Sequence, residues 1–161
     1  MGNKKNLMKR IKSALISLSD KSNLKTLLLE LKRNNIKVIS SGGTFKEIKR
    51  LKFKCEEVST FTGFGEILDG RVKTLHPKIY AGILSKRNNK SHINDIKKNN
   101  FENIDLVIVN FYPFEKILEQ TKNHIKIIEN IDVGGPAMVR AAAKNYNDVT
   151  VITSINQYSE L

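Results

Sequence analysis

Stretch 70–77, with the sequence Gly-Arg-Val-Lys-Thr-Leu-His-Pro, gathers two cations, a hydroxyl and an imidazole. Arg71, Lys73 and Thr74 are close enough in sequence to bind one anion, because arginine offers a planar fork of donors and lysine a point charge. His76, next to a proline, has the chemistry of an acid or a base, although an imidazole that anchors a loop is the commoner role. The stretch therefore predicts an anion site, and the alternative is a solvated strip of surface charge.

Polar clusters also occur where other predicted strands end or helices begin. They are Ser17 to Lys21, Ser41-Gly42-Gly43-Thr44, Asn110 with Tyr112, and Asp132 to Gly135. In a parallel sheet the carboxyl ends of the strands converge on one edge, where open α/β sheets bind ligands. Glycines at a strand-to-helix turn let an anion approach backbone N–H groups. Each cluster alone is explained as a tight connection, but together they predict a site for a phosphorylated small molecule.

The apolar pattern predicts the elements that position these clusters. Strands are predicted at 14–18, 37–40, 53–58, 104–109 and 148–153, and helices at 24–31, 44–51, 85–100, 113–120, 124–130, 137–144 and 154–161. Run 104–109 is apolar on both faces, which predicts a central strand. Segment 59–77 has no periodicity and is predicted to be irregular, and Ser91 is the expected cap of helix 85–100. The alternation predicts a three-layer α/β domain, a mainly parallel sheet flanked by helices.

Composition narrows the classes of function. A chain of 161 residues is the size of one domain and can bury a core without metals or disulfides. The single cysteine, Cys55, and the absence of a long apolar run in the sequence predict a cytoplasmic protein with no membrane contact. The net charge of +12 suits an anionic partner, but the lysines are scattered, so compositional drift is favoured over nucleic-acid binding. We expect a basic lead-in at 1–12, with an RNA-binding arm as its alternative, before a domain at 13–161.

Several familiar motifs are missing from the sequence. It has no Gly-x-Ser-x-Gly elbow and no partner pattern for a reactive Cys55, which argues against hydrolysis by a catalytic triad. It also lacks the glycine signatures of dinucleotide and nucleoside-triphosphate binding. No spacing of histidines, cysteines and acids suggests a metal site. The sequence therefore predicts chemistry without a metal or a cofactor.

An ordered set of motifs resembles one known family, the bifunctional AICAR transformylase/IMP cyclohydrolases of purine biosynthesis. The match is to their N-terminal IMP cyclohydrolase domain, and it covers nearly everything after the lead-in. The matching pieces are Leu18-Ser19-Asp20-Lys21, Ser41-Gly42-Gly43-Thr44, Thr62-Gly63-Phe64, Gly70 to Pro77, Ala81-Gly82-Ile83-Leu84, Asn110 to Phe114, Ile131 to Gly135 and Arg140 to Asn145. One such piece would be weak evidence, but the whole set in the family's order is highly specific.

The resemblance implies a methylglyoxal-synthase-like fold and an enzyme that closes the second purine ring, converting the formamido-imidazole-carboxamide ribonucleotide FAICAR to IMP with loss of water. It implies that the nucleotide is held by Ser17, Ser19, Lys21, Ser41, Gly42, Gly43, Thr44, Arg71, Val72 and Thr74; we add Asn110, Gly134 and Gly135 as substrate-binding candidates. It implies that the candidate catalytic residues are Lys73, Tyr112, Asp132 and Lys144. A homodimer is the oligomer that the resemblance allows, and the family's larger transformylase domain is not matched.

Ring closure requires a carboxamide nitrogen to attack a formyl carbon within one molecule, so correct positioning supplies much of the acceleration. In our hypothesis Asp132 takes the amide proton, while Lys144 and backbone N–H groups near Gly134 stabilise the oxyanion. Lys73 and Tyr112 position the base and relay protons to the departing oxygen. Lys144 lies about 12 Å beyond Pro136 along its predicted helix, so a cation that caps the helix end is the alternative.

Three other functions compete with the ring-closing enzyme. A non-catalytic regulatory module of the same fold would keep the phosphate-binding residues and lose the catalytic candidates, so the presence of Tyr112, Asp132 and Lys144 favours an enzyme. Methylglyoxal synthase relies on a different arrangement of aspartates and histidine, which stretch 70–77 does not match. A nucleic-acid binder ranks last.

Overall fold

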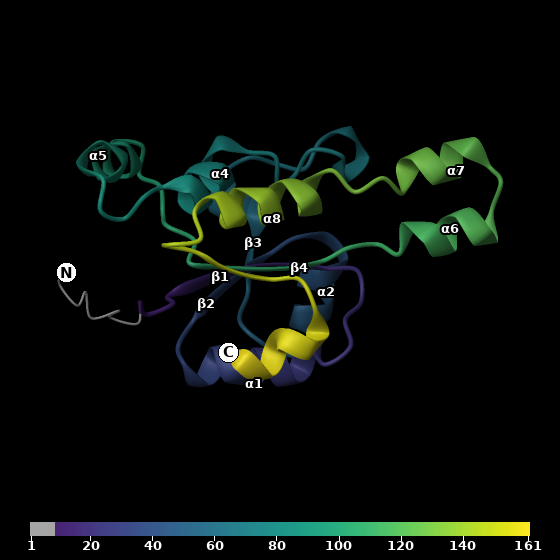
Figure 1. Ribbon diagram of the computed structural model, residues 1–161, viewed down its shortest axis with the longest axis horizontal. Helices are drawn as coiled ribbons and strands as arrows, with labels where there is room; N and C mark the ends of the chain where they lie inside the picture. Colours follow the sequence, from purple (N-terminus) through teal and green to yellow (C-terminus); the bar gives the residue numbers. More distant parts are fainter. Residues whose placement is uncertain (1–8) are drawn as a thin grey trace, which may run out of the picture.

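Five parallel strands form the centre of the protein, in the order β3-β2-β1-β4-β5. Their bounds are Ser13–Leu18 (β1), Lys37–Ser40 (β2), Glu56–Glu57 (β3), Leu106–Asn110 (β4) and Thr150–Ile152 (β5). The computed structural model describes residues 9–161, so most of the predicted basic lead-in lies outside the described residues. The sheet confirms the predicted α/β class, and every pairing between its strands is parallel (Figure 1).

Helices cover both faces of the sheet. They are α1 (Leu24–Arg33), α2 (Gly42–Arg50), α3 (Val58–Thr62), α4 (Pro77–Leu84), α5 (Lys90–Lys98), α6 (Phe114–Gln120), α7 (His124–Glu129) and α8 (Gly134–Lys144), with 3-10 helices η1 (Leu68–Gly70) and η2 (Ile155–Glu160). In Figure 1, α4 and α8 lie on one face, and α1, α2 and the C-terminal η2 on the other. This arrangement is the predicted three-layer fold.

The core has two halves because side chains alternate along each strand. Leu15 and Val107 point to one face, where they pack with apolar residues of α3, α4 and α8. Ile16 and Ile108 point to the other face, against the leucines of α1 and Ile48 of α2. Strands β1 and β4 are buried on both faces, as the continuous apolar run at 104–109 predicts.

Some local predictions were wrong. Segment 59–77 is helical in part, because it contains α3 and η1. Helix α5 is capped by the Asn89 side chain, which accepts hydrogen bonds from the backbone N–H groups of Ser91 and His92, so Ser91 is not the cap. The predicted edge strand at 53–58 shrinks to the two residues of β3. The last segment is a 3-10 helix that Ser154 and Gln157 close with a capping box.

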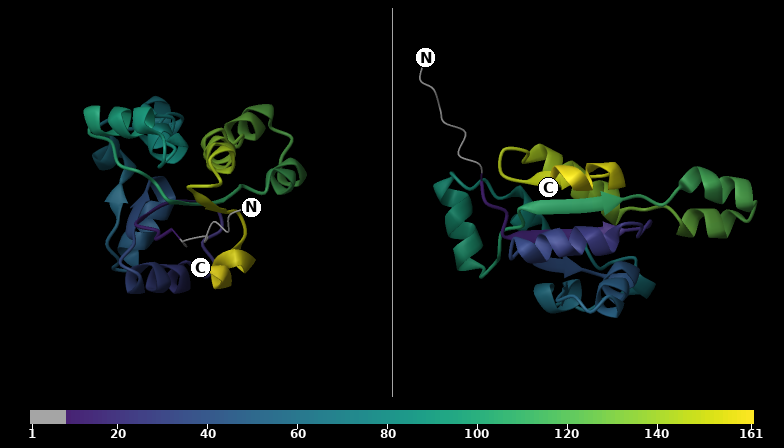
Figure 2. Two further views of the ribbon diagram at one scale, coloured as in Figure 1. Left: turned by 60° about the vertical axis from the view of Figure 1, so that its left-hand side comes forward. Right: turned by 90° about the horizontal axis from the view of Figure 1, so that it is seen from below.

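Helices α6 and α7 form an arm that projects from the body (Figure 1, and Figure 2, right). No residue of either helix is buried. Large apolar side chains stay exposed along the arm and at its base, and they are Phe111, Phe114, Leu118, Ile125, Ile128, Ile131 and Val133. The arm continues directly from the end of β4, so the residues at its base lie next to the edge of the sheet.

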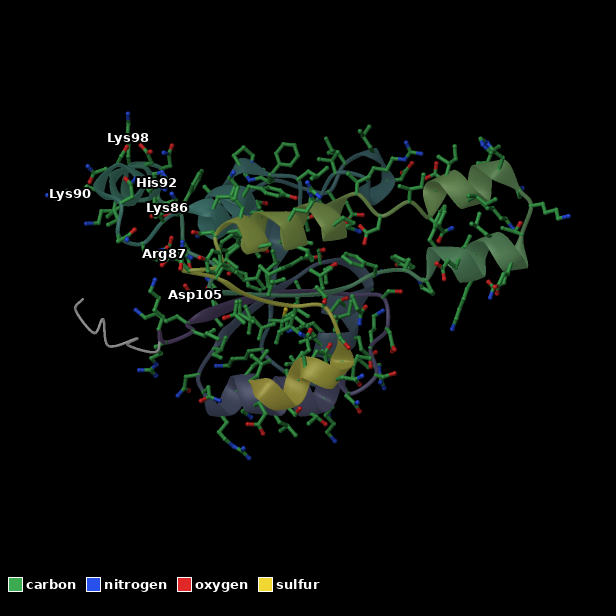
Figure 3. The ribbon with its side chains drawn as sticks, in the orientation of Figure 1. Lys86, Arg87, Lys90, His92, Lys98 and Asp105 are labelled. Carbon is green, nitrogen blue, oxygen red and sulfur yellow. The ribbon has the colours of Figure 1, made fainter. Side chains whose placement is uncertain are left out.

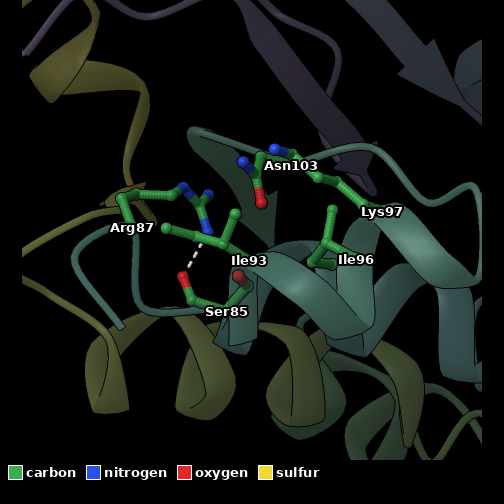
Figure 4. Close-up of a pocket in the computed structure, with 6 residues that line it drawn as sticks. All are labelled: Ser85, Arg87, Ile93, Ile96, Lys97 and Asn103. Carbon is green, nitrogen blue, oxygen red and sulfur yellow. Dashed lines mark hydrogen bonds between the residues drawn. The ribbon is translucent and has the colours of Figure 1, made fainter. Parts of the chain in front are cut away.

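Arg87 closes the opposite end of the sheet, near α5 (Figure 3). Its guanidinium donates to the carbonyl oxygens of Gly82 (3.2 Å) and Ile104 (2.9 Å) and lies 3.5 Å from the carboxylate of Asp105. A cavity of about 160 Å³ beside it is lined by Ser85, Arg87, Ile93, Ile96, Lys97 and Asn103 (Figure 4). Backbone carbonyls and one acid satisfy this arginine, which therefore has a structural role.

Among residues 9–161 we find no helix with the length and apolarity that crossing a bilayer requires.

Candidate active site

The carboxyl ends of β1, β2 and β4 share one edge of the sheet. Ser40 pairs with Ile16, and Asn110 pairs with Leu18, so the loops that follow these strands start side by side. This edge faces away from Arg87 and towards the arm (Figures 1 and 3). The polar clusters after β1, β2 and β4 therefore converge as the sequence predicts.

Asn110 shapes the loop after β1. Its Oδ1 atom accepts hydrogen bonds from the backbone N–H groups of Ser19 (2.7 Å) and Asp20 (3.0 Å), and its Nδ2 atom donates to the carbonyl oxygen of Asp20 (2.7 Å). These bonds occupy the amide group that we expected to bind substrate. Asn110 thus holds the loop that carries two other candidates, Ser19 and Lys21.

Thr44 has a similar role at the start of α2. Its hydroxyl donates to the carbonyl oxygen of Leu18 (3.0 Å) and accepts from the backbone N–H of the same residue (2.9 Å). The side chain is buried, with 4% of its surface exposed. The hydroxyl that we predicted to bind substrate therefore ties the glycine turn to the end of β1.

Two lysines flank the glycine turn. Gly42 has a φ of +55°, a conformation that favours glycine, and the Lys73 Nζ atom lies 3.3 Å from the position that a Cβ there would take. The Lys21 Nζ atom lies 3.8 Å from the corresponding position at Gly43 and donates to the carbonyl oxygen of Ser19 (3.1 Å). Two ammonium groups and the start of α2 meet here, which makes the turn a place for an anion.

A cavity of about 290 Å³ opens beside this turn. Its lining includes Ser41 and Lys73, both predicted site residues, and six others: Glu57, Val58, Ser59, Phe64, Gly65 and Glu66. Glu57 and Val58 lie at β3 and at the start of α3, and the other four belong to segment 59–77. Phe64 is part of a motif of the resemblance, but none of the six was predicted as a site residue. Glu57 and Glu66 bring negative charge to a cavity that otherwise carries one lysine, so the cavity is polar and mixed in charge.

The start of α8 joins the same cluster. A Cβ at Gly134 would lie 2.6 Å from the Oγ1 atom of Thr74, so the loop that carries Lys73 packs tightly against this helix end. Asp132 accepts a hydrogen bond from the backbone N–H of Gly135 through Oδ1 (2.8 Å). A carboxylate at a helix N-terminus is favourable for its negative charge. Lys73 and Asp132 thus belong to two elements in direct contact.

Tyr112 and Arg71 lie at the border of the site. Tyr112 follows β4 at the base of the arm, with 55% of its surface exposed. The Arg71 guanidinium is paired with the carboxylate of Glu129 in α7, and both side chains are exposed. Arg71 therefore points to the arm, and Glu129 would share it with any bound anion.

The structure does not bring Lys144 to this cluster. Lys144 is exposed in the last turn of α8, whose first residue, Gly134, is the one at the site. The two residues are ten positions apart, which is about 15 Å along a regular helix. No contact of the described residues links Lys144 to the cluster, so its role in stabilising the oxyanion stays a prediction. A cation in the last helical turn, beside the unpaired carbonyls, was the alternative and fits its position.

The remaining predicted residues are at the edge of the sheet or in the loop. Ser17 lies in β1 opposite Val109. The backbone of Val72 is bridged to that of Ile67, with N···O distances of 3.2 and 3.4 Å. His76 caps α4, because its Nδ1 atom accepts from the N–H of Lys78 (3.1 Å). This confirms the anchoring role that we preferred for His76.

Tyr80, a side chain close to this cluster, was not predicted from the sequence. Tyr80 belongs to an apolar run of α4, and its hydroxyl is buried without a hydrogen-bond partner among the described residues. Burial raises the pKa of Tyr80, and the negative charge of Asp132 raises it further. Burial also raises the pKa of the Cys55 thiol, to about 12, so this cysteine stays a neutral thiol near neutral pH. Within residues 9–161, no three His, Cys, Asp or Glu side chains form a group suited to a metal ion.

The fold and the position of the site define a parallel α/β domain whose strand-end loops surround a cationic glycine turn. Comparison with protein families agrees, because the MGS-like domain matches residues 23–137. The chain belongs to this family. A solved structure, the crystal structure of ForH, superposes with a TM-score of 0.81 at 30% identity, over 93% of this chain and 77% of that one.

Similarity to curated relatives is more specific than the match to the family. The chain is 50% identical over 150 residues to the bifunctional purine biosynthesis protein PurH of Acetivibrio thermocellus, covering 92% of this chain and 29% of the relative. It is 51% identical over 146 residues to PurH of Prochlorococcus marinus, covering 90% and 28%. PurH of Clostridium kluyveri is 48% identical, covering 94% and 30%. The chain therefore spans less than a third of the length of these relatives.

Proposed function

We propose that the chain is an enzyme of purine biosynthesis, an IMP cyclohydrolase that closes the FAICAR ring to IMP and releases water. The observation that carries the proposal is the contact between Thr74 and Gly134, which joins the loop of Lys73 to the helix start of Asp132. A cationic turn for the phosphate lies beside this pair. The similarity to proteins named for purine biosynthesis supports the same conclusion.

The phosphate binds at the turn 41–44 in this proposal. Backbone N–H groups at the start of α2 and the ammonium groups of Lys21 and Lys73 supply the donors and the charge. Arg71 joins them when the phosphate draws it from Glu129. Thr44 and Asn110 hold the loops in place through their hydrogen bonds and do not contact the nucleotide.

The chemistry falls to three side chains. Asp132 accepts the proton of the carboxamide nitrogen as this nitrogen attacks the formyl carbon. The backbone N–H groups at the start of α8 and the Lys73 ammonium stabilise the oxygen that becomes negative. That oxygen gains two protons before it leaves as water. Tyr112 relays the carboxamide proton that Asp132 accepted, and the formamido nitrogen releases the second as its bond to the former formyl carbon becomes double. No residue of the far end of α8 takes part, so Lys144 has no role in this scheme.

The arm supports a homodimer as the working form. Between residues 114 and 129 three glutamates balance three lysines, whereas the whole chain carries +12. A neutral, apolar arm avoids the repulsion between two basic bodies, and exposed apolar surface of this kind commonly marks an interface. Sedimentation of the purified chain tests this; a monomer at all concentrations contradicts it. We also infer a cytoplasmic location, which suits a chain with one unpaired cysteine.

The purified chain, given FAICAR, should produce IMP, which the change in ultraviolet absorbance follows directly. A folded chain that binds IMP without any turnover contradicts the enzyme and favours a non-catalytic nucleotide-binding module of the same fold. A folded chain that binds neither FAICAR nor IMP contradicts both. Asp132→Asn is the matched control, because it keeps the shape of the side chain and removes the base, so turnover should disappear while nucleotide binding remains.

A further inference from the structure

The buried hydroxyl of Tyr80 has no partner among the described residues. Tyr80 lies in the first half of α4, a helix that packs against α8, and its ring contacts the core on that face of the sheet. Buried polar groups are nearly always hydrogen-bonded, because an unmade bond costs the whole desolvation of the group. An unpaired phenol beside a candidate active site therefore needs an explanation.

The chain just before α4 contacts the start of α8, where Thr74 packs against Gly134. At the other end, the Asn145 side chain after α8 donates to the carbonyl oxygens of Ile83 and Ser85 at the end of α4. The two helices therefore run side by side in the same direction, and Tyr80, in the first half of α4, lies beside the half of α8 that Asp132 precedes. The negative charge of Asp132 raises the pKa of Tyr80 in addition to burial, which agrees with this placement.

In the described part of the chain, the Asp132 carboxylate has one hydrogen bond, from the N–H of Gly135 to Oδ1. The other oxygen, Oδ2, has no donor. A buried donor on α4 and a carboxylate oxygen without a donor at the start of α8 thus belong to two helices that pack together.

We propose that Tyr80 is a positioning residue for Asp132, donating its O–H to the carboxylate when substrate closes the site. The inference rests on the proposed function, in which Asp132 is the base. Hydrogen bonds of catalytic groups are often too long in the free protein and tighten in the complex. With Gly135 on one oxygen and Tyr80 on the other, the carboxylate is held in one orientation, and a lone pair of Oδ2 points to the amide proton.

The neighbours of the pair include apolar core residues of α8 and the loop that carries Lys73. Core residues of α8, such as Met138, lie on the same side of the sheet as Tyr80. Thr74, next to Lys73, packs against Gly134 and brings that lysine to the same helix start. Lys73 and Asp132 are therefore charged groups of two elements that meet at the start of α8.

Tyr80→Phe tests the proposal, because it keeps the ring and removes the hydroxyl. We expect kcat for ring closure to fall about tenfold with KM nearly unchanged. This is less than the roughly 100- to 10,000-fold of general acid–base catalysis itself, because the base remains. The acidic limb of the pH profile of kcat, which reports the enzyme with substrate bound, should move to higher pH, since the carboxylate loses a bond that favours its charged form. When Tyr80→Phe is added to the Asp132→Asn variant, turnover should not fall any further.

The chain offers a matched control in Tyr158. Its hydroxyl is also buried and unpaired, but it lies in η2 and packs in the half of the core on the other face of the sheet. Tyr158→Phe therefore deletes the same group away from Asp132 and should leave kcat and the pH profile at wild-type values. A wild-type rate and profile in Tyr80→Phe, or equal losses in both variants, overturns the proposal.

A second measurement separates this proposal from the proposed function. The carbon-13 signal of the Asp132 carboxyl reports its titration without turnover, in the free chain and with IMP. Its midpoint should rise in Tyr80→Phe and stay unchanged in Tyr158→Phe. If wild-type protein fails to convert FAICAR, the proposed function fails, and this titration still decides whether Tyr80 bonds Asp132. An identical midpoint in wild type and Tyr80→Phe, with and without IMP, overturns the bond.

Discussion

Arg71, in the loop before α4, forms an ion pair with Glu129 in the last turn of α7. The pair joins stretch 70–77 to the arm, whose position Figure 1 shows. The Arg71 side chain is 63% exposed and the Glu129 side chain 50%, so the pair contributes little to the free energy of unfolding. A phosphate that binds Arg71 has to compete with this carboxylate.

Removing the competitor should therefore tighten substrate binding. Glu129→Gln is expected to lower KM for FAICAR by about two- to fivefold at low salt, since an exposed pair contributes about 0.2–1 kcal/mol. The difference should vanish at high salt, where exposed charges are screened. Steady-state kinetics at two salt concentrations measure this. Glu119→Gln, which changes the charge of the arm equally, is the control, and an equal drop in KM would point to net charge instead of the pair.

Lys73 should be essential for turnover. Its ammonium lies beside Gly42 and lines the cavity, so Lys73→Ala removes charge from both the phosphate turn and the reacting atoms. We expect kcat/KM to fall by about 100-fold or more, the scale of losing one electrostatic group at an active site. Lys98→Ala, an exposed lysine of α5 at the opposite end of the molecule (Figure 3), should leave kcat/KM unchanged. Full activity in Lys73→Ala would remove this residue from the site.

Lys144 should be dispensable for chemistry. Because it lies at the far end of α8, about 15 Å from Gly134, Lys144→Ala should keep kcat within about twofold of wild type. The loss should fall on stability instead, at about 0.3–1 kcal/mol for a cation in the last helical turn. Enzyme kinetics and urea unfolding on the same preparation separate the two effects. A large loss of kcat in a fully folded variant would mean that Lys144 reaches the substrate.

The sequence predicts the layers of this fold better than the bonds at its site. Strands β1 and β4 are continuous apolar runs, and such runs in an alternating α/β pattern are typical of buried parallel strands. The arm was predicted as two helices, but its projection was not, because periodicity indicates that a helix has an apolar face and not what covers it. The two bonds of Thr44 to Leu18 depend on how α2 meets β1, which no single stretch of sequence encodes.

The same distinction between what sequence patterns predict and what they miss applies to the site residues. Lys73 and Asp132 were found because polar groups at predicted strand ends and helix starts converge in a parallel sheet. Lys144 came from the resemblance alone, and the length of α8 argues against it. Tyr80 was not a candidate, because it begins an apolar run in which a tyrosine usually packs, and the unpaired state of its hydroxyl is visible in three dimensions only.

Thr44 should be a stability residue. Thr44→Val keeps the buried volume but leaves the N–H and the carbonyl oxygen of Leu18 without their hydroxyl partner. An unsatisfied buried group costs about 1–3 kcal/mol, so urea unfolding should show a loss of this size. Thr44→Ser retains the hydroxyl and should recover most of the stability. If valine and serine variants unfold at the same urea concentration, the hydroxyl does not hold α2 to β1.

Gly134 should tolerate no side chain. A Cβ there would lie 2.6 Å from the Thr74 hydroxyl, a separation that forces the buried loop or the helix to move. Alanine is favoured over glycine by about 1 kcal/mol inside a helix, and Gly134 is the first residue of α8, so a net loss of stability in Gly134→Ala is a lower bound on the cost of the clash. We expect about 1–2 kcal/mol of destabilisation, the usual scale of overpacking, together with a fall in kcat, because the clash separates the loop of Lys73 from the helix of Asp132. Gly65→Ala is the control. Nothing lies within 4 Å of the position that a Cβ at Gly65 would take, so the stability of this variant should stay within about 0.5 kcal/mol of wild type. A Gly134→Ala protein as stable and as active as wild type would show that the contact between Thr74 and Gly134 does not assemble the site.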